Sequence, residues 1–195
     1  MDFSEVVSRR RMVRSYRPDP VADEVVDRIL DTARRAPSAG FAQPHRFVVV
    51  TDAAARRRVA DACGEPAALA RGLAPWLSVA PVHVVPCVAI ADYEARYAAP
   101  DKEASRGPSG WDVPYWWVDG GAALMMLLLA TIDEGLAAGF LDVPAADLRR
   151  AADVPDHWTP LGLVTIGHAA DDTAVGSARR RPRRSLDEVV HRPDR

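Results

Sequence analysis

The stretch Ala33-Arg34-Arg35-Ala36-Pro37-Ser38-Ala39-Gly40-Phe41-Ala42-Gln43-Pro44-His45-Arg46-Phe47-Val48-Val49-Val50 decides how this chain folds. Its first residues end a helix, because apolar side chains recur at helical spacing up to that point, at Val21, Val25, Val26, Ile29, Leu30 and Ala33. Pro37 stops this helix, since proline lacks an amide proton and crowds the preceding turn. The small residues of the loop Pro37 to Pro44 let another molecule approach the backbone, and free amides in such a loop bind anions or planar ligands. The loop can equally be a plain connector to the strand that follows.

Three apolar runs predict the strands of a sheet. Arg46 to Thr51 is continuously apolar after its first residue, so we expect it to be covered on both faces. Val82 to Ile90 contains Pro86, which predicts an edge strand or a bulge. Leu161 to Gly167 is the third run. Asp19 as N-cap, with Pro20 at the first helical position, predicts where the helix before Pro37 begins.

Val118 to Leu136 is the most hydrophobic element of the chain. It is apolar all round, which predicts a buried helix. Its apolar run is shorter than the roughly 20 residues that a membrane span needs, so we expect no membrane association. A helix without a polar face also suits the centre of a subunit interface.

Length and composition narrow the class of protein. The chain has 195 residues, of which 48% are hydrophobic, and this predicts one domain over residues 1–195. A net charge of -2 disfavours a nucleic-acid partner. The N-terminus is unlike a signal peptide, and neither the two cysteines nor the five histidines have metal-ligand spacing, so we expect a cytoplasmic protein without a metal.

Aromatic residues gather between Ala91 and Trp117, among prolines, glycines and charges. These aromatic side chains either line a substrate pocket, or they pack onto the core beneath a surface loop. Our candidates for a pocket lining are Phe41, Trp111, Trp116 and Trp117.

Two arginine clusters lie near opposite ends of the chain, from Arg9 to Arg17 and from Arg179 to Arg184. These clusters are either charged surfaces exposed to solvent or terminal arms that hold nucleic acid. Alternatively, both clusters bind one phosphate, for which the planar guanidinium is well suited.

The order of these motifs resembles that of the FMN-dependent nitroreductase family over essentially the whole chain. The resemblance rests on Arg10-Arg11-Met12-Val13-Arg14-Ser15-Tyr16, Ala36-Pro37-Ser38-Ala39-Gly40-Phe41-Ala42-Gln43-Pro44, the helix from Gly121 to Leu136, the strand from Leu161 to Gly167, and the basic segment from Arg181 to Val190. It implies an α+β fold with a mixed, mostly antiparallel central sheet flanked by helices, in an intertwined homodimer with flavin sites at the interface.

The same resemblance implies the chemistry and its residues. NAD(P)H would reduce FMN by hydride transfer, and a nitroaromatic, quinone or similar small molecule would then accept the electrons in the same place. The implied FMN-binding residues are Arg10, Arg11, Met12, Arg14, Pro37, Ser38, Ala39, Phe41, Ala138, Gly139, Phe140, Arg181 and Arg183. Pro37, Ser38, Ala39 and Phe41 would reach the flavin of the partner subunit, and no side chain is assigned as an acid, base or nucleophile.

The chain departs from the family pattern at Met12, Phe41, His45 and Asp142, where the family commonly has serine, asparagine, tryptophan and glycine. These changes bear on redox tuning and on substrate choice. Two alternatives therefore stay open. One is a specialised biosynthetic oxidase or dehydrogenase on the same fold, or an enzyme that uses a deazaflavin. The other is a flavin- or nucleic-acid-binding protein without turnover.

Overall fold

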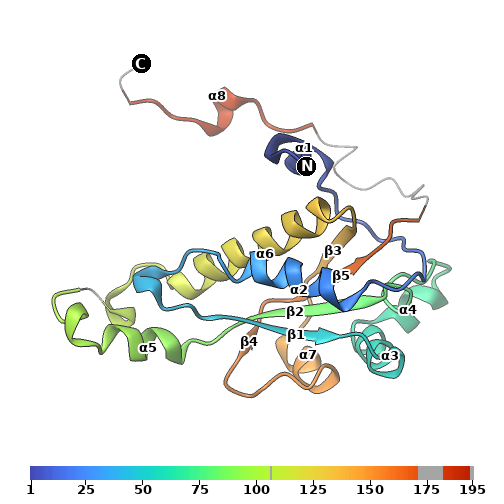
Figure 1. Ribbon diagram of the computed structural model, residues 1–195, viewed down its shortest axis with the longest axis horizontal. Helices are drawn as coiled ribbons and strands as arrows, with labels where there is room; N and C mark the ends of the chain where they lie inside the picture. Colours follow the sequence, from blue (N-terminus) through green and yellow to red (C-terminus); the bar gives the residue numbers. More distant parts are fainter. Residues whose placement is uncertain (106, 171–181, 194–195) are drawn as a thin grey trace.

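A computed structural model describes residues 1–105, 107–170 and 182–193. Its centre is one sheet in the order β1-β2-β5-β3, with the short β4 paired to β2 (Figure 1). The strands are β1 (His45–Val50), β2 (Val82–Val88), β3 (Ala137–Leu141), β4 (Thr159–Pro160) and β5 (Leu163–Gly167). Every pairing between these strands is antiparallel.

Helices cover both faces of the sheet, and α2 and α6 lie on one face while α3 and α7 lie on the other (Figure 1). The helices are α1 (Phe3–Arg9), α2 (Asp23–Ala33), α3 (Ala53–Ala62), α4 (Glu65–Ala70), α5 (Ala91–Tyr97), α6 (Tyr115–Asp133), α7 (Ala145–Ala151) and α8 (Leu186–Val189). Short 3-10 turns span Ala39–Phe41, Pro100–Lys102 and Pro108–Gly110. The predicted α+β class, with a mostly antiparallel sheet flanked by helices, is confirmed.

Each face of the sheet has its own hydrophobic core, because side chains alternate along β2. Val82 and Val84 face α2 and α6, whereas Val85 and Cys87 face α3 and α7. All seven residues of β2 are buried. This strand is therefore the centre of the domain.

The prediction of an edge position for β2 is wrong. Pro86 is tolerated because it lies where the neighbouring strand changes from β5 to β4. Its carbonyl accepts a hydrogen bond from Leu161 N at 2.9 Å on that side. The missing amide proton of proline therefore falls in a gap of the ladder, where it breaks no pairing.

The outer strands of this order are β1 and β3 instead. Val49 is 39% exposed, so the prediction that β1 is covered on both faces is wrong for the single chain. The helix α2 also begins later than predicted, at Asp23, with Ala22 as its N-cap. Asp19 forms an ion pair with Arg17 rather than a cap, at 2.8 Å.

The central helix α6 is buried on one face only. On the buried face, Gly120, Ala123 and Leu127 pack inward. A Cβ added to Gly120 would lie only 2.9 Å from a side-chain atom of Leu161 and 3.0 Å from one of Val88, so the helix packs closely there. The opposite face exposes apolar side chains at Trp117, Val118 and Met125. With 19 helical residues α6 does reach the length and apolar composition of a membrane span, contrary to our expectation. Its packing against α2 and β2 is that of the core helix of a globular domain.

Candidate functional site

The first arginine motif runs along the start of β3. Val13 N donates a hydrogen bond to Ala138 O at 2.9 Å. Tyr16, which is buried, places its hydroxyl 3.1 Å from Val13 O and 2.8 Å from Thr165 Oγ1. A Cβ on Gly139 would lie only 2.4 Å from Val13 O, so the two segments can approach this closely only because residue 139 is glycine. Two of the predicted groups of site residues, Arg10–Arg14 and Ala138–Phe140, are thus side by side.

The residues that follow β5 join the same assembly. Tyr16 forms an isolated bridge with Ala169, and Arg17 N donates to His168 O at 2.9 Å. This pairing directs the chain toward its C-terminal basic segment. Arg181 lies outside the described residues, whereas Arg183 is exposed in the segment 182–193.

The arginines at this place carry uncompensated charge. Arg9 pairs with Glu5 at 2.7 Å and Arg17 with Asp19 at 2.8 Å, but within the described part of the chain Arg10, Arg11 and Arg14 form no ion pair. The guanidinium of Arg14 lies 5.9 Å from the centre of the Trp76 ring. Three arginines without an ion pair to a described residue, in a segment whose backbone runs beside β3, can bind a phosphate and the carbonyl oxygens of a planar ring.

Trp76 stands on a firmly held loop. The carboxylate of Glu65, only 4% exposed, accepts hydrogen bonds from the backbone amides of Trp76, Leu77 and Ser78. Burial opposes its ionisation, but the bonds to Ser78, Trp76 and Leu77 outweigh burial and lower the pKa of Glu65. The loop that carries the Trp76 ring beneath Arg14 is therefore held in place by these hydrogen bonds.

The loop from Pro37 to Pro44 forms a second group, away from the arginines. Gly40, Phe41 and Gln43 all have positive φ angles, of 62°, 59° and 51°. Phe41 is 72% exposed, so it neither anchors the loop in the core nor is sheltered by this chain. Arg96 of α5 donates from Nε to Gly40 O at 2.7 Å and holds the strained turn.

An aromatic cavity of about 440 Å³ adjoins this loop, lined by Ala39, Tyr97, Trp111, Asp112, Val113 and Tyr115. Trp111 is at its centre, with ring centroids 5.3 Å from Tyr97 and 5.1 Å from Tyr115. Trp111 therefore lies where a pocket residue was predicted. The other three candidates, Phe41, Trp116 and Trp117, are not among the residues that line this cavity.

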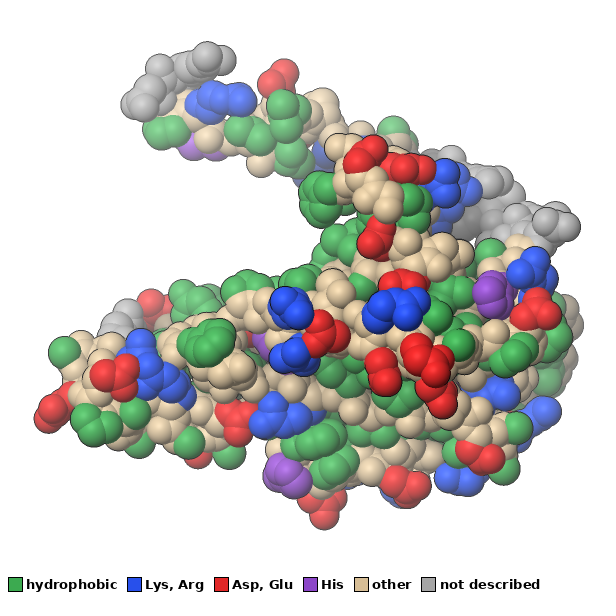
Figure 2. Space-filling view, viewed as in Figure 1, with side chains coloured by type: hydrophobic (Ala, Val, Ile, Leu, Met, Phe, Trp, Pro, Cys, Tyr) green, Lys and Arg blue, Asp and Glu red, His purple; other side chains and the backbone are tan. Residues whose placement is uncertain are grey.

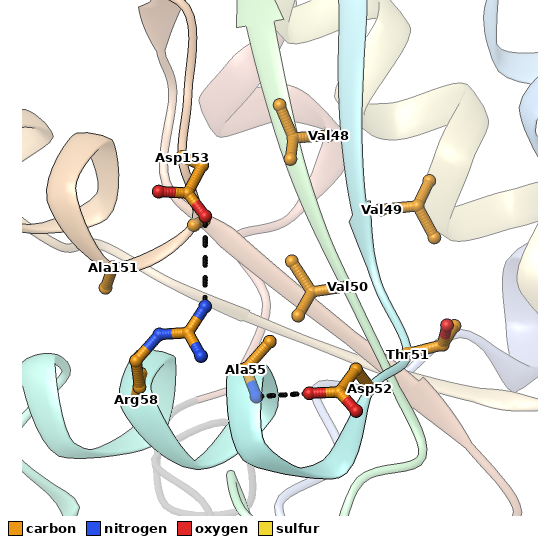
Figure 3. Close-up of a pocket in the computed structure, with 10 residues that line it drawn as sticks. Val48, Val49, Val50, Thr51, Asp52, Ala55, Arg58, Ala151 and Asp153 are labelled. Carbon is orange, nitrogen blue, oxygen red and sulfur yellow. Dashed lines mark hydrogen bonds and ion pairs between the residues drawn. The ribbon is translucent and has the colours of Figure 1, made fainter.

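A smaller cavity of about 250 Å³ lies at the edge of β1, between α3 and α7 (Figure 3). Val48, Val49 and Val50 form its apolar side, and Arg58 faces Asp153 across it at 3.8 Å. It contains none of the predicted site residues.

The two groups of predicted residues stand at opposite ends of α6. The loop Pro37 to Pro44 is tied to Asp119 near the start of α6, through a hydrogen bond from Ala39 N. The arginine motif is tied to β3, which follows the other end of α6. From Asp119 to its last residue, Asp133, α6 rises about 20 Å at 1.5 Å per residue. Figure 1 shows the same separation, so one chain does not bring its two groups together.

Sequence reasoning missed the side chains that hold these groups in place. Tyr16 lay inside the arginine motif but was given no role, and Glu65, Tyr93 and Asp119 were not singled out. Burial chiefly raises the pKa of Tyr16 and of Tyr93, so both hydroxyls stay protonated and serve as donors. The only signal for Asp119 was a carboxylate near the start of a mostly apolar helix.

Comparison with known proteins identifies the family and the fold of this chain. The sequence pattern of the Nitroreductase family matches residues 7–168. A Bacillus subtilis protein named FMN reductase (NAD(P)H) is 29% identical over 192 residues, which are 93% of this chain and 69% of that protein. A 5,6-dimethylbenzimidazole synthase of Rhodospirillum rubrum is 47% identical over 66 residues, or 34% of this chain and 31% of that protein. The solved structure of a nitroreductase family protein from Streptococcus pneumoniae has a TM-score of 0.73 at 19% identity, and the match covers 98% of this chain and 100% of that one.

Proposed function

This chain belongs to the nitroreductase family, and from that premise we propose that it is an FMN-dependent oxidoreductase. It takes a hydride from NAD(P)H and, in a second half-reaction, reduces a nitroaromatic, a quinone or a similar electron-poor molecule. We place it in the cytoplasm as a single domain over residues 1–195.

The observation that carries this proposal is the unpaired charge of Arg10, Arg11 and Arg14 beside β3. FMN has a phosphate and a ring whose pyrimidine oxygens become more negative on reduction, so this donor set fits it chemically. When bound, FMN supplies the hydride chemistry. Arg14 then stabilises negative charge at the pyrimidine end, while Arg10, Arg11, Arg181 and Arg183 hold the phosphate.

The backbone contributes the remaining contacts on this side. Met12 offers only its backbone, since it has no hydroxyl where the family commonly has serine. Ala138, Gly139 and Phe140 present the backbone of β3 beside the arginine motif. Their position is fixed by the bond from Val13 N to Ala138 O, so the ring meets a prepared surface.

The loop residues Pro37, Ser38, Ala39 and Phe41 complete the site from a second copy of the chain, in an intertwined homodimer. Exposed apolar side chains support the dimer, on α1 at Phe3 (74%) and on α8 at Leu186 (64%) and Val189 (61%), together with the outer face of α6. Figure 2 shows an open hollow between the segment 182–193 and the body, with hydrophobic side chains on both. A lone chain would leave this surface in water.

The aromatic cavity beside Ala39 is the acceptor pocket in this proposal. Trp111, Tyr97 and Tyr115 offer ring faces and edges to a planar, electron-poor molecule. Phe41, Trp116 and Trp117 were predicted to share this role. Of these, Phe41 is free to reach a flavin held by the partner, because its ring is exposed.

The experiment is to purify the protein, identify the cofactor released on denaturation, and follow reduction of the bound flavin by NADH and by NADPH. We expect a yellow protein that releases FMN, sediments as a dimer and passes electrons to menadione or nitrofurazone. A colourless protein that takes up no added FMN contradicts the proposal and favours a nucleic-acid-binding role for the arginine clusters.

A second candidate is synthesis of 5,6-dimethylbenzimidazole, favoured by the 47% identity to the Rhodospirillum rubrum synthase over a third of this chain. This candidate corresponds to the specialised biosynthetic enzyme that the sequence left open. Chromatography of an aerobic mixture of protein, FMN and NAD(P)H distinguishes the two, because only the second candidate forms this product.

A further inference from the structure

Asp119 is a buried carboxylate to which the proposed reaction gives no chemical step. It is 6% exposed and lies near the start of α6. A single oxygen, Oδ2, accepts a hydrogen bond from Ala39 N at 2.8 Å and another from Tyr93 Oη at 2.7 Å. A buried carboxylate is costly unless its oxygens accept hydrogen bonds, so we expect breaking either of these bonds to be unfavourable.

The two donors belong to different parts of the proposed site. Ala39 is in the loop that reaches the flavin, and it also lines the aromatic cavity. Tyr93 is fully buried in α5 and packs edge-on against Trp111, with ring centroids 5.4 Å apart. Trp111 is the central ring of the cavity wall. The Oδ2 atom of Asp119 thus joins the flavin loop to the wall of the cavity through one contact on each side.

The loop needs such an anchor, because its backbone is strained. Phe41 and Gln43 have φ angles of 59° and 51°, a conformation that side chains other than glycine rarely adopt. Strain of this kind persists only where the surroundings fix it. Arg96 holds the next carbonyl, Gly40 O, at 2.7 Å, so the loop is clamped at consecutive residues.

We propose that Asp119 is a positioning residue that sets the gap between the flavin loop and the aromatic wall, and so selects which acceptors fit. This inference rests on the proposed function. Asp119 touches neither cofactor nor acceptor. It acts through the amide of Ala39 on one side and through the ring of Tyr93, packed on Trp111, on the other.

The variants are Asp119→Ala, Asp119→Asn and Tyr93→Phe, with Asp133→Asn as the matched control. Asp133 lies in the same helix, but its carboxylate is half exposed and pairs with the N-terminus. Asp119→Asn keeps an oxygen that can accept both bonds, but a neutral amide oxygen is a weaker acceptor than a carboxylate. Tyr93→Phe removes one donor and leaves the ring packing in place, so it remains informative if Asp119→Ala fails to fold.

The first readout is hydrogen exchange at the Ala39 amide by NMR, in the protein without added substrate. Loss of a hydrogen bond to a charged group should lower the protection of the donor amide from exchange by about tenfold or more. We expect exchange at least about tenfold faster in Asp119→Ala than in wild type. We also expect intermediate values in Asp119→Asn and no change in Asp133→Asn. Unchanged protection in Asp119→Ala, or in Asp119→Asn if the alanine variant does not fold, overturns the inference.

The second readout is the ratio of kcat/KM for a small acceptor, 1,4-benzoquinone, to that for a bulky one, nitrofurazone. We expect Tyr93→Phe and Asp119→Asn to shift this ratio, with the FMN dissociation constant within about twofold of wild type. A constant ratio overturns the role in selection. Failure of the proposed function appears separately, as a wild-type protein that binds no FMN, and leaves the exchange result at Ala39 intact.

Discussion

Gly139→Ala tests whether β3 positions the arginine motif. The added Cβ would lie 2.4 Å from Val13 O, 3.0 Å from Thr165 Oγ1 and 3.2 Å from Tyr16 Oη. A carbon and a carbonyl oxygen normally approach to about 3.3 Å, so the motif must move away by roughly 1 Å. The bond from Val13 N to Ala138 O and the bonds of Tyr16 are then lost or stretched.

If the equivalent of two of these bonds is lost and their buried partners are left unsatisfied, stability falls by about 2–4 kcal/mol. For a chain of this size we expect Tm to fall by roughly 5–15 °C. Because Arg14 directly follows Val13, we also expect FMN to bind about tenfold more weakly or worse, as for loss of a charge-assisted contact.

Thermal melting and a fluorescence titration with FMN measure both effects. Gly107→Ala is the matched control, since its Cβ would lie 3.6 Å from Tyr97, an ordinary contact. Tyr16→Phe separates the effects, because it removes hydrogen bonds without displacing the motif, and should lower Tm with little change in FMN affinity. If Gly139→Ala behaves like Gly107→Ala in both assays, the motif does not depend on its contact with β3.

Three further predictions follow from individual side chains. Arg14→Ala should weaken FMN binding about tenfold or more. Arg17→Ala should change FMN binding little, because the guanidinium of Arg17 already pairs with Asp19. Equal effects of the two variants in an FMN titration would refute the assignment of Arg14. Phe41→Asn should leave Tm unchanged or slightly raised, because the phenyl ring is 72% exposed and asparagine tolerates a φ of 59° better than phenylalanine does. The rates at which acceptors reoxidise the flavin in stopped-flow experiments should shift. A large fall in Tm would show that the ring is a core anchor. Burial lowers the pKa of His83 from 6.5 to about 4, so the unfolded chain binds a proton that the folded chain does not, and stability should fall by up to about 3 kcal/mol as pH drops from about 6.5 to 4. Urea unfolding at several pH values should show this slope in the wild type and a flatter one in His83→Gln.

The sequence identified elements where a single physical signal dominates. The helical repeat of apolar residues before Ala33 predicted α2, although its first turn was placed too early. The apolar runs predicted β1, β2 and β5 to within a few residues. Pro86 misled because a proline can be accepted inside a sheet where the neighbouring strand is interrupted, and only the pairing reveals such a gap.

The sequence named the segments of the candidate site but could not give their arrangement. The arginine motif and Ala138 to Phe140 are neighbours through hydrogen bonds between backbones 125 residues apart, Val13 to Ala138, which no local pattern encodes. The outer face of α6 was expected to be buried, because composition cannot tell burial in the core from burial against a second chain. The roles of Asp119 and Glu65 depend on backbone amides that only the fold brings to them.

The central claim is that one flavin site takes its arginines from one chain and its loop from another. Two variants test it: Arg14→Ala in the first half of the site, and Ala39→Glu in the second half, where a bulky anion would oppose the cofactor. Each homodimer should bind FMN weakly. The variants are then co-expressed with different tags, and the heterodimer is isolated and titrated with FMN.

A site shared between chains predicts that the heterodimer contains one site with both changes and one with neither. It should therefore bind one FMN per dimer with wild-type affinity. If each site is built within a single chain, every site carries one change, and a heterodimer without any wild-type site would contradict the account.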